Sequence, residues 1–582
     1  EPTQNPDASA VPKKVKRERK DGSAGLKEIE ALDISEKKEE PGRAASDRVV
    51  GCTSWDQVKS AVESGKGKVR IDANISATGT VTVPSGSTVV IFPKSSENYS
   101  ITRSASFVGG ALFRVKGTLT IEASSAVNPS TGARTLLSVK GRQSTMYAGA
   151  PLLTVDGGTL NLAAGYLGWN SFLKDPGNPG ILSGDGGCVR VNSGAFHMTG
   201  GVIEQSAALN GGGVSVQYGA SFTMSGGQIV GNRTAQSTRD ENDTTGNGGG
   251  VAVYGTFVMT GGTIGGDFTS GGNVFRGNTA DFAGGVAIIS GTAAISGGTI
   301  SRNAATKHGG GLHLYGERSA ETGRLDVTGG IISENTAPRG GGIFLSTRGM
   351  LNIGTSDTAP VISRNTSTTT TNEFGGGGIY ASKTASGFTI QNGIFDGNAA
   401  VMHGGAVATQ AETSVSGGRF VRNSAKSGGA IRSSGNLLVS GGLFGGGSAA
   451  EGNTAGDSGA AIAQSGGNTM TLSGGTIAYN SGGIGALFVA SNGRLSMRGG
   501  EIHSNANTSG IAVNGNASTS GVALISGGTI YGNGLAGIGN SGSVTVEGTA
   551  VIRNNATYGI INNGNGTLRM ENGRIFSNGN AA

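Results

Sequence analysis

The chain has 582 residues, of which 110 are Gly, 12 are Pro and 2 are Cys, with a formal net charge of +6 at pH 7. Glycine at about three times its ordinary share, without a strict Gly-X-Y period, excludes collagen, and a hydrophobic content of 35% favours a solenoid with a thin continuous core over one large globular core. The positive charge is a weak excess without a sustained basic stripe flanked by aromatic side chains, which argues against a nucleic-acid partner.

Residues 1–50 are polar and charged and contain no aromatic side chain. Such a segment buries too little apolar surface to fold alone, so we expect a disordered arm or linker. The sequence Val49-Val50-Gly51-Cys52 resembles the end of a lipoprotein signal, but charged residues stand where an apolar run must precede it. We therefore expect no lipid anchor. No apolar run is long enough to cross a membrane, so we expect no transmembrane segment.

Residues 51–67 predict a helix that caps the N-terminal end of a stack of strands. Ser54 followed three residues later by Gln57 is a capping-box pattern, and Trp55, Val58 and Val62 then fall on one helical face. Gly65 ends the segment. A solenoid needs such a cap because its first rung, meaning one full turn of the stack, otherwise exposes core and backbone edges.

Residues 68–185 contain short alternating segments rich in β-branched residues, and we interpret them as irregular early rungs. Cys52 and Cys188 lie 136 residues apart, which places them several rungs apart in a stack rising about 4.8 Å per rung. We therefore expect two unpaired thiols and not a disulfide.

Residues 186–582 carry an internal repeat with a Gly-Gly-x-Ile segment, as in Gly226-Gly227-Gln228-Ile229. A second segment follows in each repeat, as in Gly340-Gly341-Gly342-Ile343, and a third alternates, as in Ser221-Phe222-Thr223-Met224. Three short strands and three turns are the content of one β-helix rung. The apolar positions that align with the isoleucine are Ile203, Ile229, Ile264, Ile300, Ile332, Ile362, Phe395, Phe420, Phe444, Ile477, Ile502, Ile530, Ile552 and Ile575.

Asparagine stands three residues after eleven of these positions, and we expect it to form a structural Asn ladder along the stack. Asparagine tolerates the left-handed backbone conformation, bonds to turn backbone and stacks with its neighbours in successive rungs. After Ile264 and Phe444 the asparagine is displaced to Asn278 and Asn453, and Ile203 is followed by Ser206. The alternative, a ligand-reading strip, is disfavoured because the spacing serves the turn. The eleven are Asn232, Asn303, Asn335, Asn365, Asn398, Asn423, Asn480, Asn505, Asn533, Asn555 and Asn578.

The predicted fold is therefore all-β: a single-stranded right-handed parallel β-helix of roughly 20 rungs at a rise of about 4.8 Å each, with an N-terminal capping helix and a disordered N-terminal arm. Long spacings between repeats imply loops that bulge from the constant core. The only dense acidic cluster outside the arm lies in one such loop, where we expect solvated side chains or, as the alternative, a calcium site. It consists of Arg239, Asp240, Glu241 and Asp243.

Two repeats resemble a known family. Phe395-Asp396-Gly397-Asn398 with Gly404-Gly405-Ala406-Val407, and Phe420-Val421-Arg422-Asn423 with Gly428-Gly429-Ala430-Ile431, are similar to the paired FxxN and GGA(I/L/V) motifs of the polymorphic outer-membrane proteins. That family consists of autotransporter-type surface proteins with a β-helical passenger used in adhesion to host cells. The resemblance implies an extracellular or bacterial cell-surface location and a host-cell receptor or glycan as partner.

We therefore expect a non-catalytic surface rod, an adhesin that binds host-cell or glycan ligands through rung faces and loops. One alternative is a structural fibre subunit that self-associates through its C-terminal rung. The other is a polysaccharide lyase or hydrolase, which needs two or three carboxylates close together on one face. No column of acidic residues one period apart appears, and the histidines lack metal-ligand spacing. We thus expect no catalytic residue, metal or other cofactor.

Overall fold

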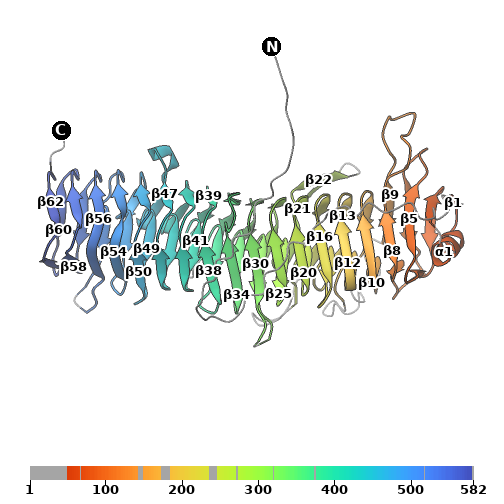
Figure 1. The fold of residues 1–582 in the computed structure, drawn as a ribbon, viewed down its shortest axis with the longest axis horizontal. Helices are drawn as coiled ribbons and strands as arrows, with labels where there is room; N and C mark the ends of the chain where they lie inside the picture. The colour runs from red at the N-terminus through yellow and green to blue at the C-terminus, as the bar shows by residue number, and fades with distance from the viewer. Residues whose placement is uncertain are drawn as a thin grey trace, which may run out of the picture. The chain divides into compact units, whose positions relative to one another are not determined.

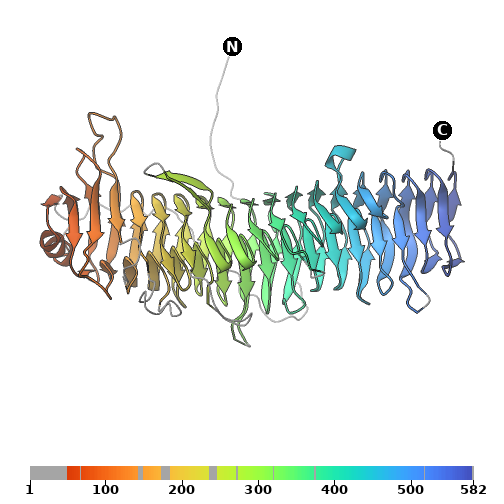
Figure 2. The same ribbon diagram turned by 180° about the vertical axis from the view of Figure 1, so that it is seen from behind.

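The computed structural model describes residues 49–65, 67–141, 149–171, 184–234, 245–270, 273–318, 320–371, 375–516 and 518–579. All of them belong to one compact unit, Asp47–Ala582. The unit is a parallel β-helix: strands from successive repeats pair side by side, and the rungs follow one another along one axis, as Figures 1 and 2 show from opposite sides. The predicted arm lies outside the described residues, apart from Val49 and Val50.

The strands form four columns, named sheets 1 to 4 in the order in which the chain visits them in a regular rung. Sheet 1 follows the glycine triplets. Its strands are β4 (Val81–Val83), β7 (Phe113–Val115), the first part of β10 (Leu153–Leu162) and of β12 (Val189–Met198), β15 (Val214–Val216), β19 (Val251–Val253), β25 (Val286–Ile289), β29 (Leu312–Tyr315), β33 (Ile343–Leu345), β37 (Ile379–Ala381), β41 (Val407–Thr409), β45 (Ile431–Ser433), β49 (Ile462–Gln464), β53 (Leu487–Val489), β55 (Ile511–Val513), β57 (Ala536–Asn540) and β60 (Tyr558–Asn562).

Sheet 2 holds the alternating segments, whose apolar residues point inward at every second position. Its strands are β1 (Val49–Cys52), β2 (Lys68–Ile71), β5 (Thr88–Pro93), β8 (Thr118–Ile121), the second part of β10 and of β12, β16 (Ser221–Met224), β20 (Thr256–Met259), β26 (Thr292–Ile295), β30 (Gly323–Val327), β34 (Gly349–Ile353), β38 (Gly387–Ile390), β42 (Thr413–Val415), β46 (Leu437–Val439), β50 (Thr469–Leu472), the first part of β54 (Arg494–His503) and of β56 (Val522–Tyr531), β58 (Ser543–Val546) and β61 (Thr567–Met570).

Sheet 3 holds the Gly-Gly-x-Ile strands. They are β3 (Ile75–Ala77), β6 (Tyr99–Arg103), β9 (Leu137–Lys140), β11 (Tyr166–Gly168), β13 (Val202–Glu204), β17 (Gln228–Val230), β21 (Thr263–Gly265), β27 (Thr299–Ser301), β31 (Ile331–Ser333), β35 (Val361–Ser363), β39 (Ile394–Asp396), β43 (Arg419–Val421), β47 (Leu443–Gly445), β51 (Thr476–Ala478), the second part of β54 and of β56, β59 (Val551–Arg553) and β62 (Arg574–Phe576).

Sheet 4 follows the ladder asparagines, and its short strands begin only in the regular repeats. They are β14 (Ala207–Ala208), β18 (Arg233–Thr234), β24 (Thr279–Phe282), β28 (Ala304–His308), β32 (Thr336–Ala337), β36 (Thr366–Ser367), β40 (Ala399–Ala400), β44 (Ser424–Ser427), β48 (Thr454–Ser458) and β52 (Ser481–Ile484). The rungs described before β14 pair in the same sheets 1 to 3, so the predicted boundary near residue 186 lies close to the first strand of sheet 4.

The N-terminal cap is the helix α1 (Trp55–Glu63). The Ser54 hydroxyl accepts a hydrogen bond from the Gln57 N–H at 3.4 Å, and the Gln57 side chain accepts one from the Thr53 N–H at 2.7 Å. Trp55, Val58 and Val62 are buried in the same core as the first strands, which confirms the predicted helix and its buried face. The strand β1 precedes it, so the predicted boundary between residues 50 and 51 falls inside a strand and not before a helix.

The core is filled by in-register stacks of like residues, because each inward position pairs with the same position of the next rung. All fourteen positions aligned from the sequence pair in succession from Ile203 to Ile575. Where the stack contains successive phenylalanines, their rings lie nearly parallel. The ring centroids of Phe395 and Phe420 are 4.5 Å apart, and those of Phe420 and Phe444 are 4.7 Å apart. This regularity confirms the repeat alignment.

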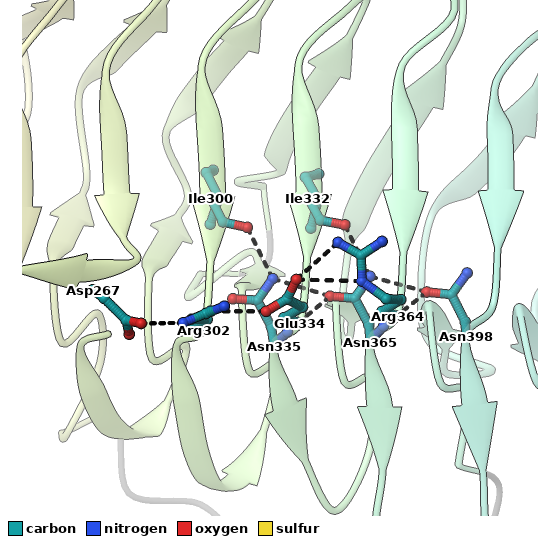
Figure 3. A network of polar contacts seen from close by, with 9 residues as sticks. All are labelled: Asp267, Ile300, Arg302, Ile332, Glu334, Asn335, Arg364, Asn365 and Asn398. Atoms are coloured by element: carbon teal, nitrogen blue, oxygen red, sulfur yellow. Dashed lines mark hydrogen bonds and ion pairs between the residues drawn. The ribbon is translucent and has the colours of Figure 1, made fainter. Parts of the chain in front are cut away.

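The asparagines form a continuous ladder inside the turn between sheets 3 and 4, of which Figure 3 shows Asn335, Asn365 and Asn398. The side chain of Asn335 donates to the Ile300 carbonyl of the preceding rung at 2.9 Å and to the Asn365 side-chain oxygen of the next rung at 3.0 Å. Its own oxygen accepts from the backbone N–H and the side chain of Asn303, both at 3.0 Å. Every polar atom of the amide is used, so the ladder satisfies turn backbone that is buried away from water.

The displaced asparagines complete the ladder as predicted. Asn278 and Asn453 accept from Asn232 and Asn423, and donate onward to Asn303 and Asn480. The segments that displace them loop out of the turn: one is the antiparallel hairpin β22 (Asp267–Ser270) and β23 (Asn273–Arg276), the other the short helix η1 (Ala449–Glu451). Ser206 stands at the ladder position before Asn232, and its N–H donates to the Asn232 side chain at 3.0 Å.

The left-handed backbone conformation belongs to the residue before the asparagine, which corrects the expectation that asparagine adopts it. Arg302, Glu334 and Arg364 have φ of 56°, 57° and 52°. Because a side chain in this conformation costs free energy, the surrounding turn must impose it. These side chains point outward and form ion pairs from rung to rung: Arg302 with Glu334 at 2.7 Å, Glu334 with Arg364 at 2.8 Å, and Arg302 also with Asp267 (Figure 3).

We predict that the substitution Asn335→Ala destabilises the protein by about 3 kcal/mol, because the Ile300 carbonyl and the Asn303 N–H lose buried partners. Adding Asn423→Ala, three rungs away, should roughly double the loss, since distant sites act independently. The measurement is the urea midpoint of unfolding, with the exposed Asn492→Ala as the matched control. An unchanged midpoint in the double variant would contradict a stabilising ladder.

Candidate functional site

The outward positions of sheet 1 form a row of side chains that pair from rung to rung. In β33 the first and third residues, Ile343 and Leu345, belong to the core, whereas Phe344 lies in a separate cluster with Tyr380 and Ala408. The row therefore lies on the other face of the sheet from the core. In successive rungs it reads Ser215, Ala252, Ala287, His313, Phe344, Tyr380, Ala408 and Arg432.

Aromatic residues of this row and its neighbours form two groups of contacting rings that meet at the cluster of Ala283, Ala287 and Ile289, and we call them together the aromatic band. His313 contacts Tyr315 and Phe344 at ring-centroid distances of 4.9 and 5.0 Å, and Phe344 contacts Tyr380 at 5.1 Å. His308 of sheet 4 stacks on Phe344 at 4.5 Å, so the band joins two sheets across the glycine turn. Its members are Tyr218, Tyr254, Phe282, His308, His313, Tyr315, Phe344 and Tyr380.

The two ends of the band differ in exposure. Phe344 and Tyr380 are only 5% and 6% exposed, so this end is a packed cluster. At the other end Tyr218 is 46% exposed, and Tyr254 and Tyr315 are half-buried. We call Tyr218, Tyr254 and Tyr315 the tyrosine end. Because its rings are partly open to solvent, this is the part of the band that a ligand can reach.

Packing against neighbouring side chains holds the tyrosine end in place. Tyr218 and Tyr254 come from successive rungs, and their ring centroids lie 5.6 Å apart. Tyr254 and Tyr315 both pack on the buried cluster of Ala283, Ala287 and Ile289, whose strand lies between theirs in sheet 1. Side chains so supported lose little conformational freedom when a ligand binds.

Polar side chains surround these rings. The Tyr218 hydroxyl donates to the Glu317 carboxylate at 3.4 Å, and the Glu317 N–H donates to the Ser290 hydroxyl at 2.8 Å. Burial raises the pKa of Tyr254, and the nearby charge of Asp185 raises it further. The Tyr254 hydroxyl therefore stays protonated at neutral pH, whereas the Tyr218 hydroxyl is bonded to Glu317 and the Tyr315 hydroxyl is buried.

Asp185 is fixed beside the tyrosine end by a second polar series at the glycine turns. Its side chain accepts a hydrogen bond from the Asn210 amide at 3.1 Å, and the Asn210 oxygen accepts one from the Asn247 N–H at 3.0 Å. Burial raises the pKa of Asp185, an effect that the Asn210 hydrogen bond and the charge of Arg190 oppose. The carboxyl group is therefore a positioned polar group beside the rings.

The histidines of the packed end are held in the neutral form. Burial is the main cause that lowers the pKa of His308, to about 4, and the charge of Arg339 adds to it. Burial also lowers the pKa of His313, whose Nε2 lies 2.9 Å from the Ser346 hydroxyl. Among the described residues, the Nδ1 atoms of both histidines lack a hydrogen-bond partner. These rings act as packing elements at neutral pH.

The structure agrees with some of the roles predicted from the sequence, contradicts one and does not describe the residues of another. The ladder asparagines from Asn232 to Asn555 are at most 1% exposed, so they cannot contact a ligand, and the ligand-strip alternative is wrong. The loop of Arg239, Asp240, Glu241 and Asp243 lies outside the described residues. Cys52 and Cys188 are both free and buried, as expected. Within the described ranges no group of three His, Cys, Asp or Glu side chains could hold a metal ion, and no helix is long and apolar enough to span a membrane.

The aromatic band was missed in the sequence, although a signal for it exists. In Gly-Gly-Gly-Ile-Phe-Leu and Gly-Gly-Gly-Ile-Tyr-Ala the residue after the isoleucine is the middle of a strand, and alternation places it outside. Aligning these middle positions across repeats would have brought His313, Phe344 and Tyr380 into one row. Comparisons of this chain with models of protein families, with curated proteins and with solved structures gave no match.

We predict that acid destabilises the protein through the buried histidines. Their folded-state pKa lies below the unfolded value of about 6.5, so the unfolded chain takes up protons first as the pH falls. The loss begins below about pH 6.5, and a folded pKa of about 4 for His308 implies about 2 kcal/mol at pH 5. Urea midpoints at pH 7.5 and 5 should differ less for His308→Gln than for the parent protein. An equal difference in both proteins would contradict this role.

Proposed function

We propose that this chain is a non-catalytic rod on a bacterial cell surface that binds glycans through the tyrosine end of the aromatic band. The observation that carries the proposal is the row of three partly exposed tyrosine rings within four successive rungs, with carboxylates and an amide nearby. Aromatic faces offer apolar contact, and fixed polar groups provide orientation, which is the usual composition of a ligand site.

The architecture supports this proposal. A ladder that satisfies the turn in every rung makes a stiff scaffold, and binding residues on such scaffolds are held in place before the ligand arrives. The FxxN and GGA motifs of two repeats resemble those of autotransporter-type adhesins, and both asparagines, Asn398 and Asn423, belong to the ladder. The resemblance supports a location outside the cell and a ligand on a host surface.

The alternative of a polysaccharide-active enzyme has specific candidates in this site. Asp185 and Glu317 both lie near Tyr254 and Tyr315, and a glycosidase needs a pair of carboxylates on either side of the scissile bond. Binding and cleavage are separated by incubating a bound polysaccharide with the protein and analysing its length. We expect no shortening, and shortening that Glu317→Gln abolishes would favour the enzyme.

We predict that Tyr218→Ala weakens binding to the recognised glycan about fivefold, because one aromatic contact is worth about 1 kcal/mol. The matched control is Tyr558→Ala, which removes a 59% exposed tyrosine outside the band. Affinities come from a glycan array followed by calorimetry on the best ligand. Equal losses in the two variants, or none in either, would contradict a binding role for the tyrosine end.

A further inference from the structure

We infer that the tyrosine end takes an uncharged oligosaccharide chain laid along the axis of the stack, and not a terminal or acidic sugar. This inference rests on the proposed function and specifies its ligand. Three features of the tyrosine end carry it: the direction in which the rings advance, the way in which polar groups of one rung reach another, and the charged groups around the rings.

The rings advance along the axis and not around a rung. Tyr218, Tyr254 and Tyr315 follow the sheet 1 strands β15, β19 and β29 in turn, and β15 pairs with β19, β19 with β25, and β25 with β29. Three rung spacings of about 4.8 Å separate the strands that precede the first and the last ring, which is about 14 Å along the axis. A ligand that contacts all three must therefore extend along the axis, as a chain of several sugar units does.

Polar contacts also cross several rungs. Glu317 follows the strand of Tyr315, yet its carboxylate accepts from the hydroxyl of Tyr218, three rungs away. Asp185 lies on the other side, before the rung of Tyr218, and is held by Asn210. Acceptors from the rung before Tyr218 and from the loop after Tyr315 thus both lie near the rings. A single sugar unit can contact only part of this series, so affinity should grow as the chain lengthens.

Charged groups of both signs lie around the rings in the part of the chain that the structure describes. The carboxylates are those of Asp185, Glu317 and Glu321, and the guanidinium groups are those of Arg318, Arg348 and Arg190. Arg318 pairs with Glu321 at 3.8 Å, and the side chain of Arg348 donates to the Gly316 carbonyl at 2.6 Å. Arg190 follows Asp185 by five residues and occupies the outward row of sheet 1 one rung before Ser215.

A site with charged groups of both signs offers donors and acceptors together. A sugar hydroxyl both donates and accepts, so uncharged sugars can use both kinds of group. The charged groups that act on Tyr254 and Tyr315 are Asp185 and Glu317, so an acidic sugar on these rings brings its carboxylate or sulfate close to like charges, which is costly. The surroundings of the rings therefore favour an uncharged chain over an acidic one.

The experiment measures binding of the full chain to three oligosaccharide series by calorimetry: cello-, malto- and manno-oligosaccharides from monosaccharide to octasaccharide. Oligogalacturonides of the same lengths serve as acidic counterparts. We expect an affinity gain of at least about tenfold between the monosaccharide and the tetrasaccharide of one neutral series, followed by a plateau. The gain should disappear in Tyr315→Ala and persist in Tyr558→Ala, with thermal melting as the check on folding.

The outcomes distinguish failure of glycan binding from failure of the proposed ligand geometry and charge. If no oligosaccharide binds, the proposed function fails and this inference fails with it. If neutral sugars bind equally well at every length, or the oligogalacturonides bind more tightly, glycan binding stands and the axial uncharged chain is wrong. If Tyr315→Ala folds and keeps the full length dependence, the ligand lies elsewhere on the rod, and the inference is again overturned.

Discussion

The fold depends on one requirement: the turn between sheets 3 and 4 is buried, and its backbone groups must find hydrogen bonds without water. The ladder asparagine meets this requirement because its side chain donates a hydrogen bond to a backbone carbonyl of the preceding rung and accepts one from the backbone N–H of the preceding asparagine. Because each amide bonds both neighbours, the turns of successive rungs must superimpose. The register of the strands on either side follows from that superposition, and so does the stacking of isoleucine and phenylalanine in the core.

The same turn explains why insertions are tolerated where they occur. The hairpin β22–β23 and the short helix η1 are insertions that project from the rung just before a ladder asparagine. After each insertion the chain returns to the same ladder position. The ladder continues through Asn278 and Asn453 without interruption. A loop in a solenoid costs little as long as its ends meet at a fixed geometry, and here the amide supplies that geometry. Variation is therefore confined to the outside of the stack.

Most of the fold could be predicted from the sequence because its signals are local and repeated. Isoleucine at a constant place and asparagine three residues later define the rung, and the displaced Asn278 and Asn453 could be recognised from their surroundings. The left-handed residue before the asparagine was missed, since Arg302 and Glu334 give no sign of a conformation that the turn imposes. The tyrosine end was missed for another reason: its residues differ in type from rung to rung, and only pairing in space brings them together.

The ladder hydrogen bonds also give the stack a direction. The backbone N–H and the side chain of Asn303 donate to Asn335, and the same relation holds from Asn335 to Asn365. Each rung thus depends on the rung that follows it in the chain. The asparagine of the following rung accepts the hydrogen bond from the asparagine N–H of the preceding rung and donates one to a backbone carbonyl of that same preceding rung. Local opening of a rung leaves unmatched donors on its N-terminal side, while the C-terminal neighbour keeps its own acceptor. Fraying and chemical damage should therefore spread unequally toward the two ends of the solenoid. Unfolding along the stack has a preferred direction, and the rungs are not equivalent units.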